Sequence, residues 1–197
     1  MSAPDSLGMR DAMLSLPEQI EASMAAIGTI AGLPDPTSIE HVMILGMGDS
    51  GFGGDLAAAS ARPFSSRPIV VYSGYLPPSW VGRSTLVIAI SRSGATEETL
   101  ESLEAAVESG SSLVVVTSGG ELETLAGRVG APVLPVLSDA VMPRAALGAL
   151  AVPPMLALEQ LGLFPGARSW LGDAVNDLKA RREELLGAHS PAKAIAD

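Results

Sequence analysis

The sequence has no cysteine, only two histidines, and aromatic residues make up 4% of its 197 positions. Without cysteine, disulfides and thiolate-bound metals are excluded, and two isolated histidines form no ligand set, so we expect no metal. Lysine and arginine number 12 against 22 acidic residues, and the net charge is −10. Nucleic-acid binding needs clustered cations, so we expect no nucleic-acid partner. The lack of cysteine is compatible with a reducing compartment, and we expect a cytoplasmic location.

Long hydrophobic runs are also missing. The longest apolar stretch, residues 145–158, is interrupted by Pro153 and Pro154 and is shorter than the roughly 20 residues that span a bilayer. We expect no membrane segment, and we interpret this stretch as a buried, kinked helix. Charged side chains interrupt any apolar targeting signal near the N-terminus, namely Asp5, Arg10, Asp11 and Glu18.

What the sequence does contain is a regular alternation of short apolar runs and helical patterns. The runs fall at residues 42–45, 69–72, 86–90, 113–117 and 133–137, and the helical patterns at 16–27, 51–61, 94–109, 120–129, 144–163 and 168–187. Because the runs are continuous in valine, isoleucine and leucine, we expect strands that are covered on both faces. This pattern predicts an α/β fold with a parallel sheet between two layers of helices.

The length predicts one core domain with appendages. We expect an N-terminal helical appendage over residues 1–33 and the core domain over 34–166. An amphipathic helix and a tail follow over 167–197.

Two short loops follow the first and third apolar runs. Residues 46–51 read Gly-Met-Gly-Asp-Ser-Gly, and residues 91–96 read Ser-Arg-Ser-Gly-Ala-Thr. Where a strand turns into a helix, backbone N–H groups and the positive end of the helix dipole converge on an anion. Two such loops facing one crevice predict a site for a phosphorylated small molecule. With few cations in the chain, the site must rely mainly on local dipoles.

The first loop also matches the G-x-G-x-x-G fingerprint of dinucleotide-binding proteins, which is a weak signal by itself. Such a site needs an acid near the end of the second strand to hold the ribose. Residues 70–74 read Val-Val-Tyr-Ser-Gly and contain no acid. We therefore expect no nicotinamide or flavin cofactor.

The second loop has a simpler explanation as well. Ser93 or Thr96 could cap the following helix, while Glu97 and Glu98 complement its dipole. Alternatively, the hydroxyls of Ser91, Ser93 and Thr96 surround a phosphate together with the N–H groups of the first helical turn. The presence of two such loops favours the phosphate.

Four motifs occur in a fixed order along the chain. They are Leu-Pro-Glu-Gln-Ile at 16–20, Gly-Met-Gly-x-Ser-Gly at 46–51, Ser-x-Ser-Gly-x-Thr-Glu-Glu-Thr at 91–99, and a Pro-Arg run from 143. Together they resemble the sugar isomerase (SIS) domain, and more narrowly the N-terminal half of bifunctional phosphoglucose/phosphomannose isomerases. The resemblance implies a three-layer sandwich around a five-stranded parallel sheet of flavodoxin-like character. It also implies cofactor-free aldose–ketose isomerisation that interconverts glucose 6-phosphate or mannose 6-phosphate with fructose 6-phosphate.

The resemblance implies particular site residues. Its substrate-binding positions are Gly48, Asp49, Ser50, Ser91, Ser93 and Thr96. The three from the second loop are implied to hold the phosphate, and Gly48 and Ser50 to line the sugar. Arg144 resembles the arginine that stabilises the enediolate oxyanion, which makes it the implied catalytic residue. Asp49 departs from the family, which usually has glycine there, and its charge would repel a phosphate unless Arg92 offsets it.

The family also has a second SIS domain that supplies a glutamate base, a ring-opening histidine and a lysine. No residue of this sequence matches those three. We therefore expect a sugar-phosphate isomerase half, with a homodimer as partner because apolar surface on the helix at 145–163 would face another copy. The alternative is a SIS module that binds a sugar phosphate for sensing or regulation and catalyses nothing.

Overall fold

The computed structural model describes residues 5–137, 142–186 and 190. Five parallel strands form one sheet with the order β2-β1-β3-β4-β5. Their bounds are β1 (His41–Gly46), β2 (Ile69–Tyr72), β3 (Thr85–Ser91), β4 (Ser112–Thr117) and β5 (Val133–Pro135). Strand β1 pairs with β2 on one side and with β3 on the other. The predicted five-stranded parallel sheet is confirmed.

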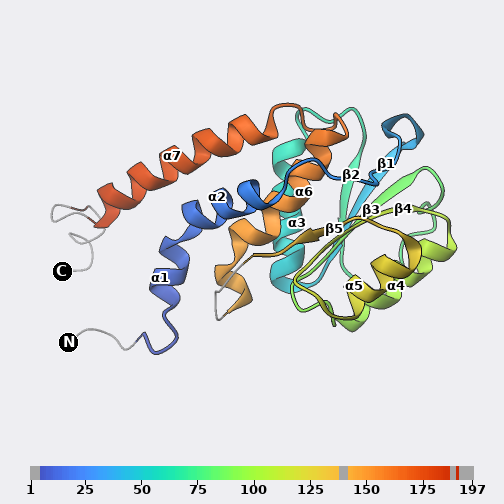
Figure 1. The fold of residues 1–197 in the computed structure, drawn as a ribbon, viewed down its shortest axis with the longest axis horizontal. Helices are drawn as coiled ribbons and strands as arrows, with labels where there is room; N and C mark the ends of the chain where they lie inside the picture. Colours follow the sequence, from blue (N-terminus) through green and yellow to red (C-terminus); the bar gives the residue numbers. More distant parts are fainter. Residues whose placement is uncertain (1–4, 138–141, 187–189, 191–197) are drawn as a thin grey trace.

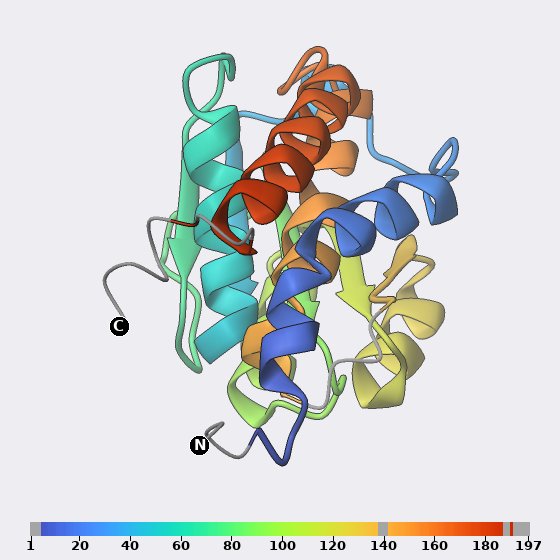
Figure 2. The ribbon, with the colours of Figure 1, turned by 90° about the vertical axis from the view of Figure 1, so that its left-hand side faces the viewer.

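Helices cover both faces of this sheet, as Figures 1 and 2 show. One face carries α3 (Gly48–Ala61) and α6 (Leu147–Gln160), and the other carries α4 (Glu97–Glu108) and α5 (Gly120–Val129). Successive strand side chains point to opposite faces, so Ile44 and Ile88 belong to one hydrophobic cluster and Met43 and Val87 to the other. Both faces are apolar, which explains the continuous runs, and the predicted three-layer α/β sandwich is confirmed.

The apolar stretch with two prolines forms the buried helix α6. Residues 148–158 are all buried, and the helix runs through Pro153 and Pro154. The expectation that this helix faces another copy is wrong, because α3, α2 (Leu16–Ala26) and α7 (Ala167–Leu186) cover it within the chain. Gln19 secures the start of α6: its amide donates to the Ala145 carbonyl at 2.7 Å and accepts from the Gly148 N–H at 3.2 Å.

Several element bounds differ from the expected ones. A first helix, α1 (Met9–Leu14), was not expected, and Asp5 starts it by accepting the N–H groups of Met9 and Arg10 at 2.9 Å each. Helix α3 begins three residues earlier than expected, and α4 begins three residues later. Short 3₁₀ turns, η1 (Pro36–Ser38) and η2 (Pro143–Ala145), precede β1 and α6. The expected tail beyond residue 186 lies outside the described residues except for Ser190.

Within the described ranges, no helix is long and apolar enough to cross a membrane. The same part of the chain holds no group of three His, Asp or Glu residues arranged to bind a metal ion.

Candidate substrate site at the sheet switch point

The two predicted loops meet at the centre of the sheet. Strands β1 and β3 are neighbours, but α3 leaves β1 toward one face and α4 leaves β3 toward the other. Such a reversal opens a crevice beyond the carboxyl ends of the strands, where α/β proteins bind ligands. A cavity of about 380 Å³ lies there, lined by Met47, Asp49, Ser50, Arg92, Ser93, Thr96, Ser118 and Pro143. We call it the switch-point cavity, and its volume falls in the range of small-molecule sites.

The hydroxyls of the second loop have different surroundings. Ser91 is buried, with 1% of its surface exposed, and its Oγ lies 2.9 Å from Oγ1 of Thr96 and accepts the Gly94 N–H at 3.2 Å. Ser93 is exposed, and within the described residues its Oγ accepts a single hydrogen bond, from the Ala95 N–H at 3.3 Å. Ser91 therefore closes the loop from inside, while Ser93 faces the cavity together with Thr96.

The helix-capping alternative can be checked at Thr96. This residue occupies the N-cap position of α4, with extended backbone angles, but its side chain caps no N–H group of the helix. Its hydroxyl is instead within hydrogen-bond distance of Ser91. The positive end of α4 is thus not used up by a capping hydroxyl, which leaves it for an anion in the cavity.

The second loop is held in place by the β4–α5 connection. The backbone N–H and the hydroxyl of Ser118 both donate to the Arg92 carbonyl, at 3.2 and 2.5 Å. The Leu122 N–H donates to the Gly94 carbonyl at 2.9 Å. Gly94 has a φ of +66°, and a Cβ there would lie 1.8 Å from the Gly119 carbonyl oxygen. The loop conformation therefore depends on glycine at position 94 and on a segment more than 20 residues away.

The first loop turns at Gly48, whose φ is +53°. Nothing lies within 4 Å of where its Cβ would be, so a ligand can approach the backbone there. The following glycines serve packing instead. A Cβ on Gly51 would lie 2.8 Å from the Gly46 carbonyl oxygen, and one on Gly54 would lie 2.7 Å from Cγ2 of Ile44. These contacts bring α3 close to β1.

Four of the expected site residues line the switch-point cavity: Asp49, Ser50, Ser93 and Thr96. Gly48 and Ser91 belong to the same loops but do not line it. Arg144 is exposed on η2, directly after the lining residue Pro143, and its own side chain is not part of the lining.

Four lining residues were not among the expected site residues: Met47, Arg92, Ser118 and Pro143. A signal for Ser118 exists in the sequence, since Thr-Ser-Gly-Gly at 117–120 follows the fourth apolar run just as the two loops follow theirs. Arg92 brings a cation to the cavity.

The surroundings of the cavity are acidic. Glu97 and Glu98 occupy the first turn of α4 but do not line the cavity. The charges of Glu97, Glu98 and Glu101 raise the pKa of the Tyr75 phenol above its usual value. A bound anion is therefore favoured only on the cavity side of α4, where hydroxyls and Arg92 replace the carboxylates.

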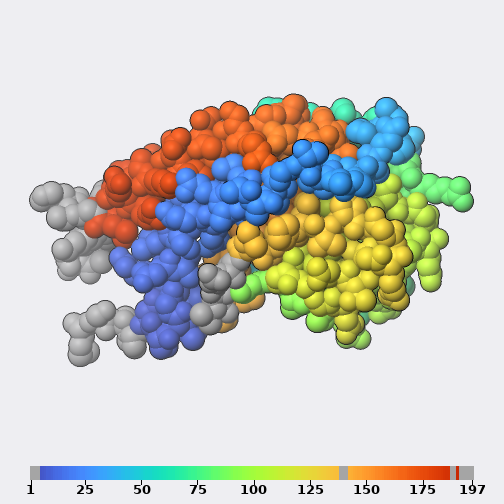
Figure 3. Space-filling view, viewed as in Figure 1, coloured from blue at the N-terminus to red at the C-terminus, as the bar shows by residue number. Residues whose placement is uncertain are grey.

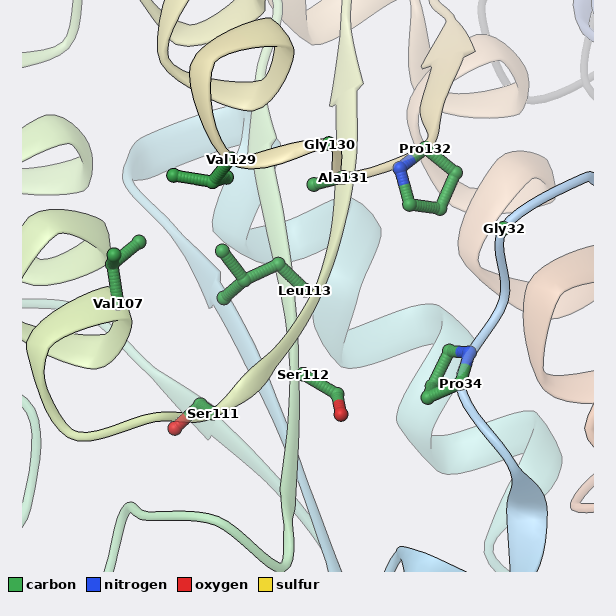
Figure 4. A pocket seen from close by; sticks show the side chains of 10 residues that line it. All are labelled: Gly32, Pro34, Val107, Ser111, Ser112, Leu113, Val129, Gly130, Ala131 and Pro132. Atoms are coloured by element: carbon green, nitrogen blue, oxygen red, sulfur yellow. The ribbon is translucent and has the colours of Figure 1, made fainter.

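A second cavity of about 230 Å³ lies at the opposite edge of the sheet, beside the starts of β4 and β5. Its lining is drawn in Figure 4 and consists of Gly32, Pro34, Val107, Ser111, Ser112, Leu113, Val129, Gly130, Ala131 and Pro132. It offers two serine hydroxyls and no charged side chain. This composition is unsuited to a phosphate, so the switch-point cavity is the better candidate.

Comparison with known proteins identifies the family of the chain. No protein-family model matches the chain. It is 33% identical over 175 residues to a bifunctional phosphoglucose/phosphomannose isomerase of Caldicellulosiruptor bescii, which is 89% of this chain and 51% of that protein. Its fold resembles a candidate phosphosugar isomerase of Clostridium difficile 630, with a TM-score of 0.67 and 15% identity over 87% of this chain and 52% of that one. It also resembles a candidate phosphosugar isomerase of Silicibacter pomeroyi DSS-3, with a TM-score of 0.65 and 19% identity over 87% of this chain and 55% of that one.

The fold and the sequence together define a SIS domain of the sugar-phosphate isomerase family. Within that family, the chain is related to the bifunctional phosphoglucose/phosphomannose isomerases, as the four motifs implied. The chain spans about half the length of the curated relatives it matches.

Proposed function

We propose that this chain binds a six-carbon sugar phosphate in the switch-point cavity. The observation that carries the proposal is the convergence of two strand-end loops on one cavity, lined by Ser50, Ser93 and Thr96. The phosphate lies against Ser93, Thr96 and the N-terminus of α4, with Arg92 as the nearby cation. Ser91 supports this arrangement through its contact with Thr96. The sugar extends toward Gly48 and Ser50 of the first loop.

The proposed reaction is aldose–ketose isomerisation between glucose 6-phosphate or mannose 6-phosphate and fructose 6-phosphate. Arg144 stabilises the enediolate oxyanion with its cationic guanidinium. In this proposal the chain is half of a two-domain isomerase, because its relatives are about twice as long. The domain limits are 1–33, 34–166 and 167–197, the last leading toward a second SIS domain, and the enzyme is cytoplasmic.

Ligand binding tests the first part of this proposal. Saturating fructose 6-phosphate or glucose 6-phosphate should raise the melting temperature, because a ligand that binds only the folded state stabilises it by mass action. Isothermal titration then gives the affinity. If both sugar phosphates and inorganic phosphate leave the melting temperature unchanged, the site assignment is wrong.

Turnover by this chain alone should be very slow. Forming an enediolate requires a base within hydrogen-bond reach of the C1 or C2 proton. In the described part of the chain, Asp49 is the one carboxylate that lines the cavity, and the resemblance places the base on a glutamate of a second SIS domain. A coupled assay with fructose 6-phosphate measures this. Binding without turnover is also what the sensing or regulatory alternative predicts. Rapid turnover that depends on Glu97 or Glu98 would show that a carboxylate outside the lining acts as the base.

A homodimer belongs to the same proposal. Phe52 and Leu56 lie one turn apart on α3 and are 59% and 38% exposed. A twofold interface is self-complementary, so one such apolar patch can cover its own copy. Sedimentation of the wild type and of Phe52→Ser should give a dimer and a monomer, respectively. A monomeric wild type at high concentration contradicts the dimer without affecting the binding site.

A further inference from the structure

Asp49 is a carboxylate in a cavity otherwise suited to an anion. It lies in the first turn of α3, is exposed, and lines the switch-point cavity with Ser50. Its carboxylate makes no hydrogen bond or ion pair with any residue that the structure describes. An ionised carboxylate only accepts hydrogen bonds, so a ligand next to it must bring donors.

The position of Asp49 also separates the cavity into two ends. Its charge complements the positive end of α3, which is then unavailable to a second anion. The α4 side of the cavity presents the hydroxyls of Ser93 and Thr96, together with the cation of Arg92. A phosphate is therefore favoured on the α4 side and repelled from the α3 side. The remainder of the ligand, lying against Asp49, is best matched by a positive charge.

We propose that Asp49 selects sugar phosphates that carry a free amino group, by pairing with the ammonium while the phosphate lies against Ser93 and Thr96. This inference rests on the proposed function and names its substrate class. An ammonium offers three donors to an acceptor-only carboxylate. A neutral sugar offers hydroxyls instead, and hydrogen bonds between uncharged and charged groups are weaker than those between two charged groups.

The test is isothermal titration of the whole chain with three ligands: glucosamine 6-phosphate, glucose 6-phosphate and N-acetylglucosamine 6-phosphate. We expect the wild type to bind glucosamine 6-phosphate about tenfold more tightly than the other two, as for one charge-assisted hydrogen bond. Asp49→Asn should remove this preference. Glu97→Gln is the matched control, because Glu97 is also an exposed first-turn acid but lies outside the cavity lining, and it should keep the preference.

A second measurement does not depend on any variant. Raising the pH until the amine is neutral should bring the wild-type affinity for glucosamine 6-phosphate down to that for glucose 6-phosphate. Equal affinities in the wild type at neutral pH, or a preference that survives Asp49→Asn, would overturn the role of Asp49. Equal losses for all three ligands in Asp49→Asn would overturn it too, because Asp49 would then accept sugar hydroxyls. If neither glucose 6-phosphate nor inorganic phosphate binds at all, the proposed function fails together with the inference.

Discussion

At the scale of single residues, the hydroxyls of the second loop divide between holding the loop and facing the ligand. Ser91 is buried and bonded within the loop, whereas Ser93 is exposed and lines the cavity. Sequence motifs treat the three hydroxyls alike, because burial depends on which side of the turn each one occupies. Under the proposed function, Ser93 and Thr96 contact the ligand directly and Ser91 supports Thr96.

Ser93→Ala should weaken the binding of glucose 6-phosphate by about 1–3 kcal/mol, the range for a lost hydrogen bond to a charged group. Its effect on folding should be small, since Ser93 accepts one long bond, from Ala95. Ser66→Ala is the matched control, an exposed serine outside the cavity lining. Titration of both folded variants measures the affinities. Unchanged affinity in Ser93→Ala would show that Ser93 does not contact the ligand and only accepts the Ala95 N–H within its own turn.

The sequence locates lining residues well when they directly follow a strand that it also locates. Asp49, Ser50, Ser93 and Thr96 were expected on this ground, and all four line the cavity. The sequence does not predict Pro143 as a lining residue, because it reaches the cavity from η2, far along the chain from either loop. Such contacts depend on how α6 returns across the sheet, which local patterns do not encode.

At the scale of elements, the site depends on the β4–α5 connection as a support for the second loop. Gly94→Ala should destroy binding and lower the free energy of unfolding by about 1–3 kcal/mol or more. An alanine there is strained in the left-handed backbone conformation, and its Cβ also clashes with the Gly119 carbonyl. Gly130→Ala is the matched control. Gly130 also has a positive φ, of +70°, but nothing lies within 4 Å of its Cβ position. We expect it to cost about 1 kcal/mol with binding intact.

Chemical denaturation gives the stability of the two glycine variants, and titration gives their ligand affinity. Both variants carry the left-handed backbone strain, but only Gly94→Ala adds a clash with the Gly119 carbonyl, so the difference between them measures the effect of the clash. Equal losses of stability, with binding retained in both, would mean that the β4–α5 connection does not fix the loop. The same comparison bears on the start of α4, which lies three residues later than the sequence pattern predicts. The helical pattern continues back to residue 94, but the loop is held open at 91–96 by partners at 118 and 122.

The strands were the most predictable elements, because helices cover both faces of the sheet and each strand contains a continuous apolar run. The exception is β5 at the sheet edge, which has three residues where the apolar run has five. Among the described strands only β4 pairs with it; Pro135 is the last paired residue, and the Val136 N–H donates to the Thr117 carbonyl at 3.0 Å. The early start of α3 was not predictable either, since its first residues, Gly48, Asp49 and Ser50, carry no apolar side chain that would extend the helical pattern.

At the scale of the whole molecule, α7 joins the end of the described chain to its beginning. Figure 3 shows α7 lying beside α2 across one side of the molecule. Arg168 donates to the carbonyls of Met24 and Ile27 at 2.8 and 2.6 Å. Lys179 pairs with Glu21 at 2.7 Å. Together these contacts hold the α2 region against α7, and both helices pack on the buried helix α6.

The pair between Glu18 and Arg182 makes this junction sensitive to acid. The Arg182 guanidinium donates to both carboxylate oxygens of Glu18 at 2.8 Å, which lowers the pKa of Glu18 below its usual value of 4.5. Because the folded-state pKa is the lower one, the pair stabilises the fold fully above the unfolded-state value. The contribution is lost as the pH falls below 4.5 and through the folded-state pKa.

Glu18→Gln should therefore lower the free energy of unfolding at pH 7 by about 0.2–1 kcal/mol, the range for a half-exposed ion pair. The gap between wild type and variant should close at a pH well below 4.5, where Glu18 is protonated in both states of the wild type. Urea denaturation at the two pH values measures this. Glu184→Gln is the control, because Glu184 pairs with Arg181 inside α7 and does not reach α2. Two results would contradict this prediction: a loss of stability in Glu18→Gln that persists in acid, or a loss at pH 7 no larger than that of Glu184→Gln. Either would show that apolar contacts, and not this ion pair, hold α2 and α7 together.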